Sequence, residues 1–249
     1  MIAGYLRWSL RGALLAALLV GSAAGWDRLR DGERFRLRTL LVSGEFEQVA
    51  PDEVYRAVRA QLGANFLAAD LAAARAAVEA LPWVASASVR REWPGTLRIS
   101  ITEQVPVATW RGRGLVAADG TVFADGAAAF PGLPALAGPE GSAAEVLATL
   151  HEMQRAVAAS GLALERIEQS DRRAWTVWFS DGTEVRLGRR DALPRLERYA
   201  RVAAPVVAPQ AAHIAYVDMR YANGFALGWR ATRPAQPARR DRNKERTDV

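Results

Sequence analysis

Cysteine is absent from the 249 residues, and histidine and lysine are scarce: the chain has two His residues, His151 and His213, and one Lys among its 33 basic side chains. The lack of cysteine excludes disulfides, cysteine nucleophiles, iron–sulfur clusters and thiolate zinc sites. Because the two histidines lie far apart in the sequence, they fit neither a zinc-binding nor a nucleophile–base pattern.

Catalytic motifs are lacking as well. The sequence contains no Gly-x-Ser-x-Gly, no phosphate-binding loop and no dinucleotide-binding fingerprint. Asp119, Asp125 and Asp181 each precede a glycine, so a role in turns explains them without catalysis. The sequence therefore predicts an interaction protein and not an enzyme, with no catalytic residue, metal ligand, cofactor or small-molecule substrate.

Positive charge is present in excess, with a formal net charge of +6, but it lies at the two ends of the chain. Residues 1–38 hold seven Arg and three acidic residues, residues 231–249 hold six basic and three acidic residues, and the residues between hold 20 Arg and 21 acidic residues. A nucleic-acid-binding domain usually carries its basic residues on folded elements. The neutral body therefore argues against a nucleic-acid partner.

The N-terminal region has one charge-free run, the 15 residues from 12 to 26. A bilayer span needs about 20 residues, which are reached by extending back to Tyr5 if the intervening arginines snorkel to the interface. Aromatic residues near both ends favour a retained membrane anchor. The alternative is a signal peptide cleaved after the small residues 22–24. The residues alone leave both interpretations open.

The orientation of such an anchor is also open from the residues. Two arginines precede the run and five follow it by residue 38, so the positive-inside rule places the body in the cytoplasm. However, large downstream domains translocate regardless of charge, and a signal-like start favours export.

The first part of the body has a β–α–α–β–β pattern. Pro51 opens one expected helix at a favoured position, and Asp70 is a typical N-cap for the next. A Pro-Gly turn joins the last two strands. The expected elements are a strand over 36–42, helices over 51–62 and 71–81, and strands over 83–90 and 97–101.

The second part of the body is expected to be mainly β-structure with two amphipathic helices. Four pairs of an acidic or amide residue with glycine predict hairpins. These pairs are Asp119-Gly120, Asp125-Gly126, Asp181-Gly182 and Asn223-Gly224. The expected strands cover 107–110, 115–117, 175–179, 185–187, 214–219 and 225–229, and the helices cover 142–159 and 192–202.

The last expected strand, residues 225–229, ends the folded body. A terminal strand often lies at a sheet edge, where its main-chain groups can pair with a strand from a partner. No proline or lysine guards this strand. The polar, Pro-containing residues 231–249 after it are expected to form a disordered tail.

Motifs across nearly the whole chain resemble the FtsQ/DivIB family of bacterial cell-division proteins. The first half offers VSG at 42–44, NFL at 65–67, LPWV at 81–84, ASVRR at 87–91, WP at 93–94 and EQVPVATW at 103–110. The second half offers DGTVF at 119–123, LPALAGP at 133–139, RRAW at 172–175, LGR at 187–189, DMRYANG at 218–224 and GW at 228–229.

The resemblance implies an α+β chain with a single N-terminal transmembrane helix, a small βααββ POTRA domain and a mainly antiparallel β domain with flanking helices. The implied divisions are a short cytoplasmic N-terminus over 1–11, a transmembrane and juxtamembrane segment over 12–30, the POTRA domain over 35–104, the β domain over 105–230 and the disordered tail over 231–249. The implied location is the inner membrane at the division septum, with the body in the periplasm.

The resemblance also implies a non-catalytic scaffold that recruits FtsB and FtsL and links early to late division proteins such as FtsK, FtsW and FtsN. In the family, FtsB adds a strand to the terminal β-strand. The matching positions are Tyr221, Asn223, Gly224, Phe225, Leu227, Gly228 and Trp229, with Arg173 as an ion-pair donor to an FtsB carboxylate. Trp229 is equally compatible with packing under the sheet. Trp83, Val84, Val89 and Arg90 are the expected POTRA contacts.

One alternative from another class is a POTRA-containing component of outer-membrane protein assembly or transport. Such proteins usually carry tandem POTRA repeats and a membrane β-barrel, and the sequence shows neither pattern.

Overall fold

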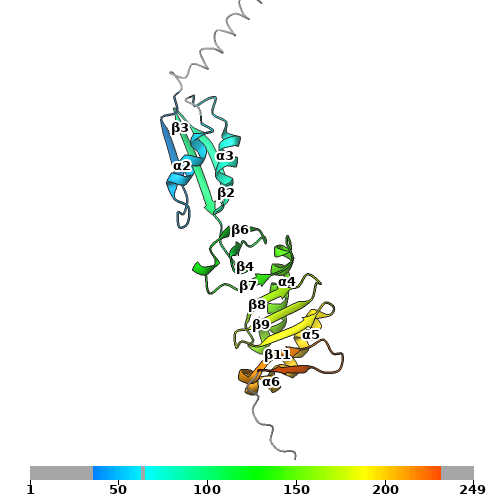
Figure 1. Ribbon diagram of the computed structural model, residues 1–249. Coiled ribbons are helices and arrows are strands. Elements are labelled where there is room, and N and C mark those ends of the chain that lie inside the picture. Colours follow the sequence, from blue (N-terminus) through cyan, green and yellow to red (C-terminus); the bar gives the residue numbers. More distant parts are fainter. Residues whose placement is uncertain (1–35, 63–64, 231–249) are drawn as a thin grey trace, which may run out of the picture. The chain divides into compact units, whose positions relative to one another are not determined.

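The computed structural model describes residues 36–62 and 65–230, and the chain divides into two compact units at Val105–Pro106 (Figure 1). Within these described ranges, no helix is both long and apolar enough to span a bilayer. The expected N-terminus over 1–11, the anchor over 12–30 and the tail over 231–249 lie outside the described residues.

The first unit is a three-stranded sheet with two helices on one face. Its elements are β1 (Thr39–Ser43), α2 (Pro51–Arg59), α3 (Leu71–Glu79), β2 (Val84–Glu92) and β3 (Thr96–Glu103). The strand order is β1-β3-β2, with β1 parallel and β2 antiparallel to the central strand. The predicted β–α–α–β–β order is confirmed, and β2 forms one edge of the sheet.

Local chemistry explains these elements. The Asp70 carboxylate caps α3 by accepting a hydrogen bond from the Ala73 N–H at 2.9 Å. Alternation along β3 buries Leu97, Ile99 and Ile101. The last two of these pack in one core cluster with residues of both helices, which covers the inner face of the sheet. Helix α2 ends at Arg59, three residues before the predicted end.

The second unit is built on a nine-stranded sheet in the order β12-β11-β10-β9-β8-β7-β4-β5-β6. Its strands are β4 (Ala108–Trp110), β5 (Gly114–Val116), β6 (Val122–Asp125), β7 (Ala135–Ala137), β8 (Leu164–Gln169), β9 (Trp175–Phe179), β10 (Glu184–Gly188), β11 (Ile214–Asp218) and β12 (Ala226–Trp229).

Helical segments connect these strands and cover one face of the sheet (Figure 1). The segments that pack on this face are α4 (Ala143–Val157), α5 (Ala192–Arg198), α6 (Ala204–Val207) and a π-helical turn η3 (Tyr199–Ala203). The 3-10 turns η1 (Ala127–Ala129), η2 (Ala158–Ser160) and η4 (Ala208–His213) are connections without buried residues. Inward residues such as Val177, Leu150 and Leu196 are fully buried between sheet and helices.

The other face of this sheet carries Trp178 and Tyr216, each beneath an arginine. The guanidinium carbon of Arg166 lies 4.5 Å from the Trp178 ring centroid, and that of Arg186 lies 3.6 Å from the centroid of Tyr216. These contacts shield part of both rings from water and hold them in place.

The second sheet is mixed. Five of its eight strand pairings are antiparallel and three are parallel, namely β4 with β7, β7 with β8 and β10 with β11. Helix α4 connects β7 to β8, and α5 to η4 connect β10 to β11, because parallel neighbours need a crossover. The expectation of a mainly antiparallel sheet is therefore correct for most pairings, but it did not include the parallel pairs and their crossover connections.

Three of the four predicted turn pairs join antiparallel neighbours. Gly182 adopts φ 78° between β9 and β10, and the Asp181 carboxylate accepts from the Thr183 N–H at 2.9 Å. The prediction is wrong for Asp125-Gly126, which ends β6 and leads into η1. The Gly126 N–H donates to the Arg113 carbonyl at 3.0 Å and so extends the β5–β6 pairing by one residue, and no later strand pairs with β6 in the described sheet.

Candidate docking edge

Strand β12 lies at one end of the nine-stranded order, so β11 is its paired neighbour within the described residues. The Arg230 N–H donates to the His213 carbonyl at 2.8 Å. Along an edge strand, the N–H and C=O groups of successive residues point alternately toward the paired strand and away from it. Since the main chain of Arg230 faces β11, that of Gly228 and Ala226 does so too, and that of Leu227 faces the open edge. The terminal strand is thus a sheet edge, as predicted.

The side chains of this strand fix which face it presents. Phe225, Leu227 and Trp229 are half-buried and pack against the main core of the unit. Gly228 lies on the opposite face, where a Cβ would overlap the Tyr216 ring. The strand is therefore held on both faces, while its main-chain edge points outward. Trp229 packs under the sheet and keeps part of its surface exposed.

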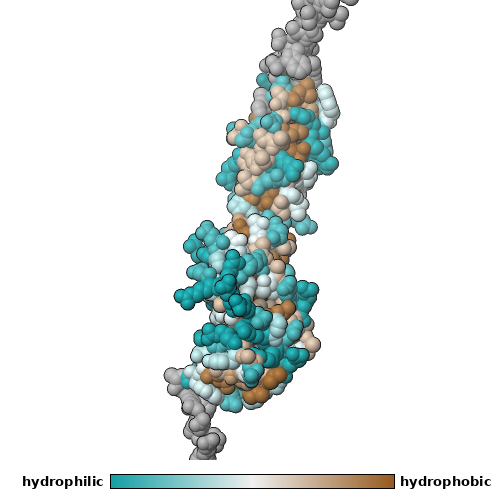
Figure 2. All heavy atoms as spheres, turned by 90° about the vertical axis from the view of Figure 1, so that its right-hand side faces the viewer, coloured by the Kyte–Doolittle hydropathy of each residue, from teal (hydrophilic) through white to brown (hydrophobic). Residues whose placement is uncertain are grey.

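The turn before β12 is exposed at Tyr221, Asn223 and Gly224, with Tyr221 58 % exposed. At its start, the Arg220 guanidinium binds the Asp218 carboxylate through Nε at 2.8 Å and a terminal nitrogen at 2.5 Å. These hydrogen bonds hold the pKa of the Asp218 carboxyl below its usual range against the opposing effect of burial. Figure 2 shows hydrophobic residues gathered at the lower end of the second unit. This is the end at which Figure 1 labels α6 and β11.

Arg173 is the one predicted site residue of the second unit that lies apart from this edge. It sits between β8 and β9, so that two strands separate β9 from β12 in the sheet order. Its guanidinium binds the Glu145 carboxylate of α4 at 2.8 Å while remaining about half exposed. A hydrogen bond from Gln169, followed by that from Arg173, lowers the pKa of Glu145. A partner carboxylate would therefore share Arg173 with an ionised residue.

The predicted POTRA contacts lie on or beside the edge strand β2. Val84 is buried, Val89 is half-buried and packs against the core, and Arg90 is exposed, while Trp83 precedes the strand. The edge is partly occupied, because the Glu79 carboxylate at the end of α3 accepts the Ala87 N–H at 3.1 Å. Arg90 is the side chain of this group best placed to meet a partner.

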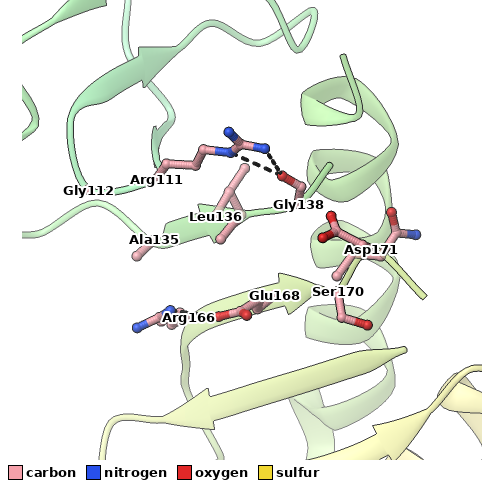
Figure 3. A pocket seen from close by; sticks show the side chains of 11 residues that line it. Arg111, Gly112, Ala135, Leu136, Gly138, Arg166, Glu168, Ser170 and Asp171 are labelled. Atoms are coloured by element: carbon pink, nitrogen blue, oxygen red, sulfur yellow. Dashed lines mark hydrogen bonds and ion pairs between the residues drawn. The ribbon is translucent and has the colours of Figure 1, made fainter. Parts of the chain in front are cut away.

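The second unit also has an open pocket of about 590 Å³ beside β7 and β8 (Figure 3). Two of its arginines have partners within the chain. Arg111 donates to the Gly138 carbonyl at 3.1 and 2.6 Å, and Arg166 binds the Glu168 carboxylate at 2.7 Å. No cluster of three or more His, Asp or Glu side chains suited to a metal ion occurs among the described residues.

Comparison with known proteins accounts for both units. Residues 35–104 match the family described as "POTRA domain, FtsQ-type", and residues 108–220 match "Cell division protein FtsQ/DivIB, C-terminal". The chain is 39 % identical over 215 residues to cell division protein FtsQ of Burkholderia pseudomallei, covering 84 % of this chain and 86 % of the relative. The chain belongs to the FtsQ/DivIB family of cell division proteins.

Further FtsQ/DivIB relatives extend the similarity over most of the chain. Cell division protein FtsQ of Escherichia coli is 33 % identical over 247 residues, which covers 94 % of this chain and 88 % of the relative. Cell division protein FtsQ of Xanthomonas campestris is 36 % identical over 223 residues, which covers 89 % of this chain and 79 % of the relative. These names support a role in cell division and give no support to the outer-membrane assembly alternative.

The FtsQ/DivIB fold brings together seven of the predicted site residues, from Tyr221 to Trp229, and separates them from Arg173. Sequence reasoning missed Arg198, which lies on α5 and contacts the turn before β12. No motif connects an arginine on a helix to carbonyl groups more than 20 residues away, so no sequence signal identified it.

Proposed function

We propose that this chain is a non-catalytic scaffold of the cell-division machinery that binds FtsB by strand addition at β12. It would thereby recruit and position FtsB and FtsL at the septum and link early to late division proteins. The observation that carries the proposal is the open main-chain edge of β12, which is held against the core through Leu227 and Trp229. Strand addition gains affinity from main-chain hydrogen bonds at such an edge.

The proposal includes a single membrane anchor over 12–30, with residues 1–11 in the cytoplasm and the body in the periplasm. The charge-free run at 12–26 and the family membership support this topology. The inner-membrane lipid is then a further partner. No cofactor, small-molecule substrate or nucleic acid is part of the proposed function.

The POTRA unit is proposed to contact other division proteins, such as FtsK, FtsW and FtsN, through the surface around β2. Arg90 would contribute its side chain, whereas the side chains of Val84 and Val89 face the core. Trp83, just before the strand, would border this surface.

Strand addition is tested by removing one outward main-chain donor. Leu227→Pro removes the N–H that faces the open edge, and an edge strand tolerates proline at such a position. Leu227→Ala is the matched control, because it shortens the same side chain and keeps the N–H. We expect an FtsB peptide to lose at least tenfold in affinity for the proline variant relative to the alanine variant, measured by calorimetry. Equal affinity of the two folded variants would rule out strand addition at this edge.

The septal role is tested in cells with a fluorescent fusion of the full chain. We expect the label to concentrate at mid-cell, and a chain truncated before Phe225 to lose co-purification of FtsB. Protease treatment of spheroplasts should degrade the body while a cytoplasmic tag on residue 1 survives. A body protected from the protease would contradict the proposed topology.

A further inference from the structure

The turn between β11 and β12 is folded around one guanidinium group, that of Arg198 on α5. One terminal nitrogen donates to the Ala222 carbonyl at 2.6 Å. The other donates to the carbonyls of Met219 at 3.0 Å and Tyr221 at 2.7 Å and lies 3.4 Å from that of Gly224. Four carbonyl groups of the turn thus converge on a single side chain.

The start of the turn has further support, because Met219 is fully buried and its N–H donates to the Arg186 carbonyl at 2.9 Å. A pocket of about 340 Å³ that is partly open to solvent adjoins the rest of the turn, and it is lined by Arg198, Val202, Met219 and residues 222–225. The exposed residues Tyr221, Ala222 and Asn223 bury little apolar surface of their own. Over residues 221–224, the hydrogen bonds of Arg198 are therefore the main contacts that hold the turn.

The same arginine has no second role within the described part of the chain. Its Nε is buried and has no hydrogen-bond partner there, and all its observed hydrogen bonds go to this turn. A lysine could not reproduce the contacts, because the planar guanidinium presents donors in a fixed fork and an ammonium group is a single point.

We infer that Arg198 is a positioning residue for partner binding: it orders the turn and so presents β12 in one register to an incoming strand. The inference rests on the proposed strand addition. A partner that met a disordered turn would have to order it on binding, and its apparent affinity would fall with the fraction of molecules in the competent conformation.

Helix α5 supplies a matched control for this inference. Arg195, one turn earlier, donates to the Leu187 carbonyl at 2.7 Å and so holds the end of β10 instead of the turn. Arg195→Ala removes an arginine–carbonyl contact from the same helix without touching residues 219–224. Any general cost of losing such a contact should appear in both variants.

The experiment compares Arg198→Ala, Arg198→Lys and Arg195→Ala in the full chain in nanodiscs. Hydrogen–deuterium exchange without a partner should be at least tenfold faster over 219–230 in Arg198→Ala, intermediate in Arg198→Lys and unchanged in Arg195→Ala. Affinity for an FtsB peptide should follow the same order, with a loss of at least tenfold in Arg198→Ala.

Two outcomes would overturn the inference. One is unchanged exchange over 219–230 in Arg198→Ala; the other is faster exchange with unaltered affinity for the FtsB peptide. If the wild-type chain fails to bind the peptide while the exchange contrast remains, the proposed partner is wrong and the ordering role of Arg198 stands.

Discussion

The two units each end their sheet in an edge strand, β2 in the first and β12 in the second, and these two edges differ in how their main chain is covered. At β2 a side chain occupies an outward donor, because Glu79 accepts the Ala87 N–H and also binds Arg75 at 2.9 Å. At β12 the arginines act on the ends instead: Arg198 binds the turn before the strand, and Arg230 Nε donates to the Ile214 carbonyl at 3.0 Å.

This difference shows how one chain can cover the main-chain groups of one sheet edge and leave those of another accessible to a partner. A charged side chain that caps an edge N–H discourages pairing with another strand. At β12 the arginine contacts lie at the ends of the strand, so they leave its outward main-chain groups uncovered. We therefore expect β12 to accept a partner strand readily and β2 to do so only after Glu79 has moved.

The largest expected effect comes from Gly228, where β12 meets β11. Gly228→Ala places a methyl group on the Tyr216 ring, over which the Arg186 guanidinium also lies. Overpacking of this kind costs about 1–3 kcal/mol, so thermal unfolding should shift to lower temperature and exchange over β12 should rise. Gly224→Ala is the control, because nothing lies within 4 Å of an added Cβ there.

Removing the Tyr216 ring should abolish the stability loss that Gly228→Ala causes. In a Tyr216→Ala background, the further change Gly228→Ala should leave the unfolding temperature nearly unaltered. An equal loss in both backgrounds would show that the overlap with Tyr216 is not what requires glycine at this position.

The next effect concerns the pH dependence of the β12 turn. Hydrogen bonds from Arg220 hold the pKa of Asp218 below its usual range in the folded chain. The stabilisation is therefore fully present above the ordinary value of 3.8 and is lost as the pH falls through the folded pKa. Asp218→Asn should lower the unfolding temperature at pH 7, and the difference from wild type should shrink as the pH falls below 3.8. A constant difference over this pH range would contradict the assignment.

The sequence predicts those parts of the fold in which apolar alternation and turn chemistry agree. Alternation at 175–179 and 214–219, with Asp181-Gly182 as a turn, locates β9, β10 and β11. The order β–α–α–β–β follows in the same way. Each of these depends on neighbours that are close in sequence.

Elements set by distant neighbours were not predictable. Strand β7 has three residues, and it exists because β4 and β8 pair with it on both sides. Strand β8 reads LERIEQ, whose charged residues hide its alternation. The distance of Arg173 from β12 and the contacts of Arg198 also depend on how the helices cross the sheet.

The smallest effect is local to β2 and tests the protected side of the comparison. Glu79→Ala should leave the Ala87 N–H without its acceptor. The same hydrogen bond is the main cause of the lowered pKa of the Glu79 carboxyl. Amide exchange at Ala87, measured by NMR, should become faster, whereas Arg75→Ala should change it less because the carboxylate remains. Glu79→Gln keeps an acceptor oxygen and should fall between them. If Ala87 exchanged at the wild-type rate in Glu79→Ala, the carboxylate would not protect this edge, and accessibility would no longer distinguish β2 from β12.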